Sequence, residues 1–196
     1  MDCYVPMNYW NSRAEKTGLE WTKPEQYGEI DWLIDRMRKQ LFPDSIPDVL
    51  EIGSGWGRVL LRFRTRGVHV RMQLCDISEE YCKKALEHTG ILPDWWDGET
   101  LPYPDDSFDL VIAQSILLHV KPEMIEQIWN ELLRVTRRYL YVATMKVRRT
   151  KKRLAFESQG NHHCFSHDYT GLIKQSGLKI LHNHSYGQRG VWIITK

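Results

Sequence analysis

The stretch Glu51-Ile52-Gly53-Ser54-Gly55-Trp56-Gly57 decides the fold predicted for this chain. The apolar run 49–52 is typical of a buried strand, and residues 56–65 after the turn have the pattern of a helix. A strand that bends sharply into a helix needs residues without a Cβ, and their absence also lets a ligand touch the backbone. Ligands of open parallel sheets bind beyond the carboxyl ends of the strands, so this turn predicts a ligand site.

The spacing of the three glycines distinguishes this turn from two common nucleotide-binding motifs. The dinucleotide-binding pattern GxGxxG would need glycine at position 58, where this chain has Arg58. The phosphate-binding pattern GxxxxGK followed by Ser or Thr is absent. Glu51 disfavours a pyrophosphate and suits a cationic ligand, such as one carrying an ammonium and a sulfonium group. A dinucleotide-dependent oxidoreductase is therefore disfavoured.

Short apolar runs alternate with amphipathic stretches along the rest of the chain, which predicts an α/β fold. Thr22–Glu25 has the pattern of a capping box, which begins a first helix that extends to Leu41. Later helices are expected after a Ser78 cap, with Pro122 in the first turn, and after a Ser166 cap. Strands are expected at residues 49–52, 68–75, 92–96, 108–113, 139–144, 178–185 and 191–195.

Two acidic residues follow the glycine turn at intervals that suit a nucleoside. Asp76 ends the second expected strand, roughly 20 residues past the glycines, where a carboxylate can accept hydrogen bonds from ribose hydroxyls. Asp97 lies in a loop where a carboxylate or a backbone amide can contact the edge of an adenine. Each has an alternative: Asp76 can cap a helix, and Asp97 can be an ordinary loop carboxylate.

Taken together, these motifs resemble the class I S-adenosylmethionine-dependent methyltransferase superfamily, in particular its small, type 11-like methyltransferase-domain group. The resemblance covers residues 45–145 well and the rest loosely. It implies a Rossmann-like, doubly wound sheet of seven strands in the order 3-2-1-4-5-7-6, with the last strand antiparallel and helices on both faces. The matching stretches are Asp48–Gly57, Asp76–Ser78, Asp97–Asp109, Ile116–His119 and Asn130–Val135.

The resemblance also implies the cofactor S-adenosyl-L-methionine, the product S-adenosyl-L-homocysteine and a set of binding residues. Glu51 and the glycines would border the methionine part, Asp76 the ribose, residues around Asp97 and Gly98 the adenine, and Gln114 the transferring methyl. The full expected set is Arg13, Glu51, Gly53, Ser54, Gly55, Trp56, Gly57, Asp76, Ile77, Asp97, Gly98, Glu99 and Gln114.

Two further segments are interpreted through the same resemblance. Tyr9–Arg13 matches an N-terminal lid that folds over the cofactor. Arg13 would then pair with the cofactor carboxylate, the alternative being a surface arginine. The family often has Lys-Pro-Gly-Gly before its fifth strand, whereas this chain has Thr136-Arg137-Arg138, which leaves that turn geometry open.

Methyl transfer from a sulfonium is an in-line displacement that needs neither a covalent nucleophile nor a metal, so no metal site is expected. A general base helps when the acceptor is a hydroxyl or a protonated amine. His119, just past the fourth strand, and His163, in the histidine-rich loop 161–168, are the candidate catalytic residues. Both can instead be structural, and the loop's His/Cys content leaves zinc as an alternative, although its spacing matches no common zinc motif.

Length and composition fit a single methyltransferase domain spanning residues 1–196: lid and helix at 1–45, cofactor-binding core at 46–145, and substrate loop and closing strands at 146–196. The net charge of +2 gives no whole-molecule attraction to nucleic acid or membrane. No membrane span, secretion signal or paired-cysteine pattern is visible, so a soluble, cytoplasmic monomer or homodimer is expected.

The expected acceptor is a small molecule. Lys146–Arg153 holds six basic residues, which form either a solvated loop or an attraction for an anionic acceptor or RNA. An RNA methyltransferase and a non-catalytic, cofactor-binding partner subunit therefore stay open. The Asn/Asp-Pro-Pro-Tyr and Pro-Cys motifs of DNA methyltransferases are absent, which disfavours DNA.

Overall fold

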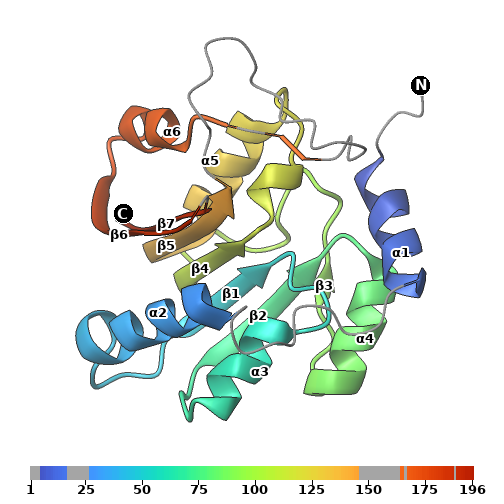
Figure 1. The fold of residues 1–196 in the computed structure, drawn as a ribbon, viewed down its shortest axis with the longest axis horizontal. Helices are drawn as coiled ribbons and strands as arrows, with labels where there is room; N and C mark the ends of the chain where they lie inside the picture. The colour runs from blue at the N-terminus through green and yellow to red at the C-terminus, as the bar shows by residue number, and fades with distance from the viewer. Residues whose placement is uncertain (1–4, 17–26, 146–163, 166, 188) are drawn as a thin grey trace.

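A computed structural model describes residues 5–16, 27–145, 164–165, 167–187 and 189–196. A seven-stranded sheet forms its centre, in the order β3-β2-β1-β4-β5-β7-β6 (Figure 1). This order, and the antiparallel pairing of β7 with both its neighbours, confirm the fold prediction. The strands are β1 (Asp48–Ile52), β2 (Arg71–Asp76), β3 (Asp94–Trp95), β4 (Phe108–Gln114), β5 (Thr136–Met145), β6 (Lys179–Tyr186) and β7 (Arg189–Thr195).

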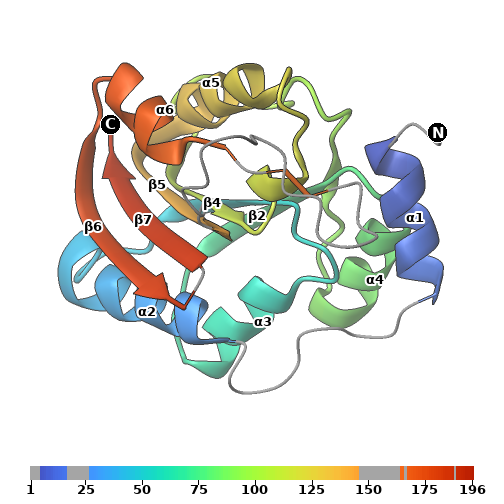
Figure 2. The same cartoon turned by 45° about the horizontal axis from the view of Figure 1, so that its top comes forward.

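Helices cover both faces of the sheet because the side chains along each inner strand point alternately into two apolar cores, one on each face. Val49 of β1 faces one core and Leu50 the other. In Figure 2, α2 (Gly28–Arg36) and α3 (Arg58–Thr65) lie on one face, with α5 (Ile125–Val135) and α6 (Tyr169–Gln175) on the other. The remaining helices are α1 (Pro6–Lys16), η2 (Met37–Leu41), α4 (Glu79–Thr89) and η3 (Leu117–His119).

Several boundaries differ from the sequence predictions. The capping box Thr22–Glu25 lies outside the described residues, and the described helix continues from α2 into the π-helix η2. Pro122 lies in a turn before α5 and not in its first turn. The cap of α6 is Asp168, two residues later than predicted, because its carboxylate accepts a hydrogen bond from Gly171 N at 2.9 Å.

The strand predictions were right in number but long for two strands. β2 begins at Arg71 and not at position 68, and β3 has two residues, Asp94 and Trp95. β5 begins earlier than expected because α5 passes directly into it at Thr136. The Thr136 hydroxyl donates to Leu132 O at 2.6 Å. Residues 136–138 are thus strand, which answers the question about the turn that the family often has there.

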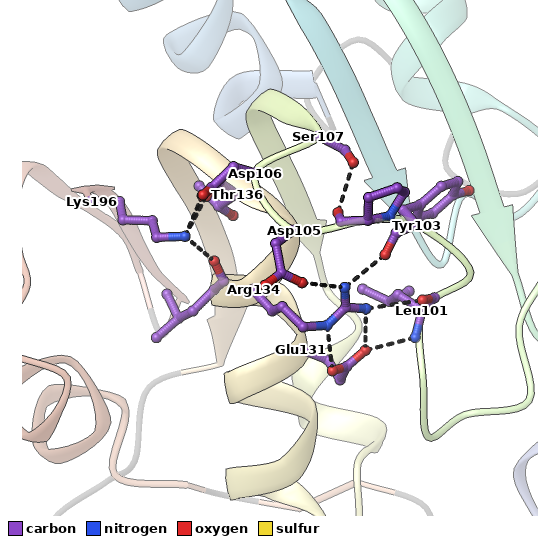
Figure 3. A network of polar contacts seen from close by, with 11 residues as sticks. Leu101, Tyr103, Asp105, Asp106, Ser107, Glu131, Arg134, Thr136 and Lys196 are labelled. Carbon is purple, nitrogen blue, oxygen red and sulfur yellow. Dashed lines mark hydrogen bonds and ion pairs between the residues drawn. The ribbon is translucent and has the colours of Figure 1, made fainter.

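Arg134, in the last turn of α5, holds the loop that leads into β4 (Figure 3). Its guanidinium donates to the carbonyl oxygens of Leu101 at 3.0 Å and Tyr103 at 2.7 Å, and to both carboxylate oxygens of Glu131 at 2.8 Å. Glu131 in turn accepts from Leu101 N at 2.8 Å. Two stretches that carried the family resemblance, 97–109 and 130–135, are therefore bound to each other at the amino edge of the sheet.

In the part of the chain that the structure describes, no helix is both long and apolar enough to cross a membrane.

Candidate functional site

The glycine turn lies at the carboxyl end of β1, and each of its glycines has a positive φ. Gly53 has φ 66°, and a Cβ there would lie 3.0 Å from Ile116 Cδ1. Gly57 has φ 86°, and its Cβ would overlap Thr89 Cγ2 at 2.3 Å. A Cβ on Gly55, at φ 55°, would meet nothing within 4 Å. Gly53 and Gly57 therefore permit close packing of protein groups, whereas the backbone of Gly55 faces open space.

Asp76, the last residue of β2, fixes this turn. Its two carboxylate oxygens accept hydrogen bonds from Gly55 N at 2.8 Å and from Ser78 N at 2.9 Å. The peptide before it contributes as well, because Cys75 O accepts from Gly53 N and Ser54 N. Burial raises the pKa of Asp76 to about 6, although the backbone donors oppose that shift. Each carboxylate oxygen keeps a lone pair that can accept a hydrogen bond from a ribose hydroxyl.

Glu51 and Ser54 are buried beside the turn, each with one side-chain oxygen that has no hydrogen-bond partner in the described part of the chain. Glu51 is 2% exposed and Ser54 is 4% exposed. Neither Glu51 Oε2 nor Ser54 Oγ has a hydrogen-bond partner among the described residues. Burial raises the pKa of Glu51 well above its usual range, opposed by the nearby charge of Arg58. Buried polar atoms without partners are costly, so a donor or cation beside Gly55 would stabilise both side chains.

The segment after β3 is placed for a planar group. Gly98 has φ 89°, and a Cβ there would lie 3.1 Å from Ile77 Cδ1. Asp97 is exposed, and its Oδ1 accepts from the backbone amides of Glu99 at 2.8 Å and Thr100 at 2.9 Å. The Asp97 carboxylate therefore shapes its own turn. The contact of this segment with adenine stays a prediction.

The predicted lid segment forms α1, which packs on α4. Asn11 Oδ1 accepts from the Ser78 hydroxyl at 2.7 Å, and Ala14 is fully buried with Trp56 and Tyr81. Trp56 is 7% exposed, so in this arrangement it belongs to the contact between α1 and the core. Arg13 lies with its guanidinium 5.9 Å from the ring centre of Trp10.

Gln114, at the end of β4, has both ends of its amide engaged. Its Nε2 donates to Glu29 Oε2 at 2.6 Å, and its Oε1 lies 3.1 Å from the Tyr141 hydroxyl. Glu29 also forms an ion pair with Arg189 Nε. Gln114 was expected beside the transferring methyl group. That placement stays a prediction, and the structure shows Gln114 in a polar cluster that joins α2, β4, β5 and β7.

The candidate base His119 lies at the same edge, half-buried. Its ring centre is 4.7 Å from that of Trp10, and its Nδ1 is 3.8 Å from Cys164 Sγ. The second candidate, His163, lies outside the described residues. Among the residues that the structure describes, no three His, Cys, Asp or Glu side chains are grouped so that they could hold a metal ion.

Sequence reasoning missed several residues at this edge because their partners are distant in the chain. Glu29 and Arg189 are 160 positions apart, and no local pattern marks either of them. Asn11 was within the predicted lid, but its contact with Ser78 depends on helix packing. Ser115 has a left-handed φ of 62°, which its sequence neighbours do not indicate.

Comparisons with known proteins agree with this geometry. The family described as "Methyltransferase domain" matches residues 49–138. The ubiquinone/menaquinone biosynthesis C-methyltransferase UbiE of Rickettsia akari is 34% identical over 91 residues. That match covers 39% of this chain and 37% of the relative, so it spans little more than a third of UbiE.

Solved structures share the fold over nearly the whole chain. A SAM-dependent methyltransferase from Aquifex aeolicus has a TM-score of 0.61 at 17% identity, covering 94% of this chain and 97% of its own. Magnesium protoporphyrin IX methyltransferase from Synechocystis, with bound SAH, has a TM-score of 0.64 at 15% identity and covers 97% of both chains. The family match over residues 49–138 and the sheet order shared with these solved structures agree, and both make this chain similar to class I S-adenosylmethionine-dependent methyltransferases.

Proposed function

We propose that this protein transfers the methyl group of S-adenosylmethionine to a small-molecule acceptor. The observation that carries the proposal is the pair of buried, unpartnered atoms, Glu51 Oε2 and Ser54 Oγ, beside the open face of Gly55. A cationic, hydrogen-bonding ligand satisfies both atoms, and the ammonium and sulfonium groups of this cofactor match that chemistry.

Each part of the site has a role in this proposal. When bound, the cofactor supplies a methyl group on a sulfonium whose leaving group is a neutral thioether. Glu51 and Ser54 hold the ammonium end, Asp76 accepts from the ribose hydroxyls, and the segment Ile77–Glu99 borders the adenine. Arg13 remains a proposed contact for the cofactor carboxylate. The protein's main contribution is to place the acceptor against the methyl group and to exclude water.

His119 is the proposed general base where the acceptor atom carries a proton. It belongs to η3, directly after β4, and thus lies at the carboxyl edge with the glycine turn. Its Nδ1 lies 3.8 Å from the Cys164 sulfur, and a neutral imidazole can accept a proton near physiological pH. His163 stays a proposal from sequence alone.

A small acceptor is supported by two of the related proteins. UbiE is named as a methyltransferase of ubiquinone and menaquinone biosynthesis, and the Synechocystis enzyme as a methyltransferase of magnesium protoporphyrin IX. Quinones and protoporphyrins are small molecules. The RNA alternative depends on the basic stretch 146–153, which lies outside the described residues.

Titration calorimetry with S-adenosylhomocysteine tests the cofactor site. Wild-type protein should bind it with a dissociation constant in the micromolar range, and Glu51→Gln should weaken binding at least about tenfold through loss of a charged hydrogen bond. Glu87→Gln is the matched control, because Glu87 is exposed on α4. Absence of heat with wild-type protein would refute the proposal.

Methyl transfer is then measured with radiolabelled S-adenosylmethionine and a cell extract separated into small-molecule, protein and RNA fractions. Label in the small-molecule fraction supports the proposal. Label in the RNA fraction only, with binding that falls steeply as salt rises, would favour the RNA alternative. Tight cofactor binding without transfer to any fraction would favour a non-catalytic partner subunit.

A further inference from the structure

A second polar group lies at the carboxyl edge, beside the proposed methyl-transfer site. Arg189 is the first residue of β7 and pairs with Met145 at the carboxyl end of β5. Its Nη2 donates to the Ser115 hydroxyl at 2.6 Å, and its Nε forms an ion pair with Glu29. Ser115 directly follows Gln114 at the end of β4, so one arginine links the last strand to the strand that leads into the site.

Arg189 lies close to the glycine turn through a short chain of contacts. A Cβ on Gly53 would lie 3.0 Å from Ile116, and Ser115, the neighbour of Ile116 in sequence, accepts a hydrogen bond from the Arg189 guanidinium. Ser115 also has a left-handed φ of 62°, and its amide donates to Ala143 O at 2.7 Å. A strained, non-glycine residue that the surroundings hold in place is typical of functional sites.

The Arg189 guanidinium has N–H groups that its bonds to Glu29 and Ser115 do not use. Its contacts with Glu29 and Ser115 use Nε and one hydrogen of Nη2, and within the described part of the chain Nη1 has no hydrogen-bond partner. The Arg189 side chain is 28% exposed, against 11% for Glu29. The open end of the fork therefore remains accessible, while the carboxylate that fixes it is buried.

The charges around Arg189 favour an additional anion. Arg58, whose pKa is lowered by burial, is close enough to Glu51, Glu29 and Arg189 to interact with all three charges. Glu51 would be balanced by the cationic cofactor, and Glu29 already pairs with Arg189. Arg58 and Arg189 therefore bring two guanidinium groups to the same part of the carboxyl edge, and both attract an anion.

We infer that Arg189 anchors a carboxylate or phosphate group on the methyl acceptor, with Glu29 and Ser115 holding the guanidinium in place. The planar fork of arginine matches both anions through paired hydrogen bonds. This inference rests on the proposed function, since it assigns the acceptor class of that same site.

Anion binding tests the inference directly. Sodium phosphate and sodium acetate are titrated into protein saturated with S-adenosylhomocysteine, at constant ionic strength, while the melting temperature is followed. Wild-type protein should show a saturable increase, and Arg189→Gln should lose it. Glu29→Gln should bind the anions about threefold or more tightly, because a competing carboxylate is removed.

Matched controls separate anion binding from folding. Arg71→Gln, which changes an exposed arginine paired with Asp48 at the opposite edge, should respond like wild type. The double variant Glu29→Gln/Arg189→Gln removes both members of the buried pair and leaves no unpaired charge if Arg189→Gln alone folds poorly. The same saturable response in wild type and Arg189→Gln, or none in wild type, would overturn the inference.

Transfer assays distinguish this inference from the proposed function. The small-molecule extract is passed over an anion-exchange resin before reaction, and acceptor activity should be in the retained fraction. Arg189→Gln should lower kcat/KM for that fraction about tenfold to a hundredfold, with cofactor affinity within twofold of wild type. Acceptor activity only in the unretained fraction would overturn the inference and leave the proposed function intact. Phosphatase treatment of the retained fraction separates the two anions, since only phosphate acceptors would be lost.

Discussion

The two edges of the sheet differ in how completely their polar groups are paired. At the amino edge, Arg134 bonds to two carbonyl oxygens and a carboxylate, and Lys196 bonds to Asp106, Leu133 O and Thr136 O. At the carboxyl edge, Glu51 Oε2 and Ser54 Oγ are buried without hydrogen-bond partners among the described residues, and Ser115 has a left-handed backbone. Stability is thus concentrated at one edge, and the capacity to bind a ligand at the other.

The two edges also differ in the role of the stretches that resemble the methyltransferase family. The stretches 97–109 and 130–135, which carry part of the family resemblance, bind each other through Arg134 and Glu131. Arginine hydrogen bonds lower the pKa of Glu131, so this pair is charged and mutually stabilising. The glycine turn, which carries another part of the resemblance, leaves the backbone of Gly55 open to a ligand. The family-like stretches at the amino edge therefore pack against each other, whereas the one at the carboxyl edge belongs to the proposed ligand site.

The largest effect on stability is expected from Gly57→Ala. The new Cβ would overlap Thr89 Cγ2, and alanine would be forced into a left-handed φ of 86°. Together these cost about 3 kcal/mol in the free energy of unfolding, measured by urea denaturation. Gly67→Ala, with φ 63° and nothing within 4 Å of the Cβ, is the control and should cost about 1 kcal/mol. Equal losses in the two variants would show that the overlap with Thr89 does not matter.

Arg134→Ala should lower the free energy of unfolding by about 2 kcal/mol, since Glu131 and two carbonyl oxygens lose charged hydrogen bonds. Affinity for S-adenosylhomocysteine should stay within twofold of wild type, because the cluster lies at the amino edge. Denaturation and calorimetry on the same preparation measure both quantities. A tenfold loss of affinity would contradict the separation of the two edges. Arg71→Ala, at an exposed pair, should change stability much less than Arg134→Ala.

Gly55→Ala should have the opposite profile. Its Cβ meets no protein atom, so only the strained φ of 55° should reduce stability, by about 1 kcal/mol. Binding of S-adenosylhomocysteine should weaken at least about tenfold, because the methyl group enters the space that the ligand would occupy. Unchanged affinity would mean that the ligand does not lie against Gly55.

The smallest effect is a pH dependence through Asp76, whose pKa is raised to about 6. Lowering the pH from 7.5 to 6 protonates about half of this carboxyl, so affinity for S-adenosylhomocysteine should fall about twofold. Stability should respond in the opposite sense. The folded state holds this proton more tightly than the unfolded state, so the contribution of Asp76 to stability rises as the pH falls from about 6 towards 4. Calorimetry at several pH values checks the first effect, and Asp76→Asn should remove it. A fall in affinity of the same size in Asp76→Asn would assign the titration to another group.

The sequence predicted the strand order through family resemblance and the glycine turn through the need for residues without a Cβ. Local patterns located β1, β4 and the Ser78 cap of α4 because these depend on neighbouring residues. The positions of Glu29, Arg189 and Asn11 depend on contacts between distant segments, and neither periodicity nor spacing encodes them. Gln114 shows the same limit: its place at the end of β4 was predicted, but its bond to Glu29 was not.

The close approach of Gly57 to Thr89 has a consequence for how this family can change. Thr89 is the last residue of α4, and its hydroxyl donates to Ala85 O at 2.7 Å and accepts from Ile91 N at 3.1 Å, so its methyl group is fixed against the turn. A larger residue at position 57 fits only if position 89 becomes smaller. Related sequences should therefore vary at these two positions together, and a homologue with alanine or asparagine at the first should have serine, alanine or glycine at the second.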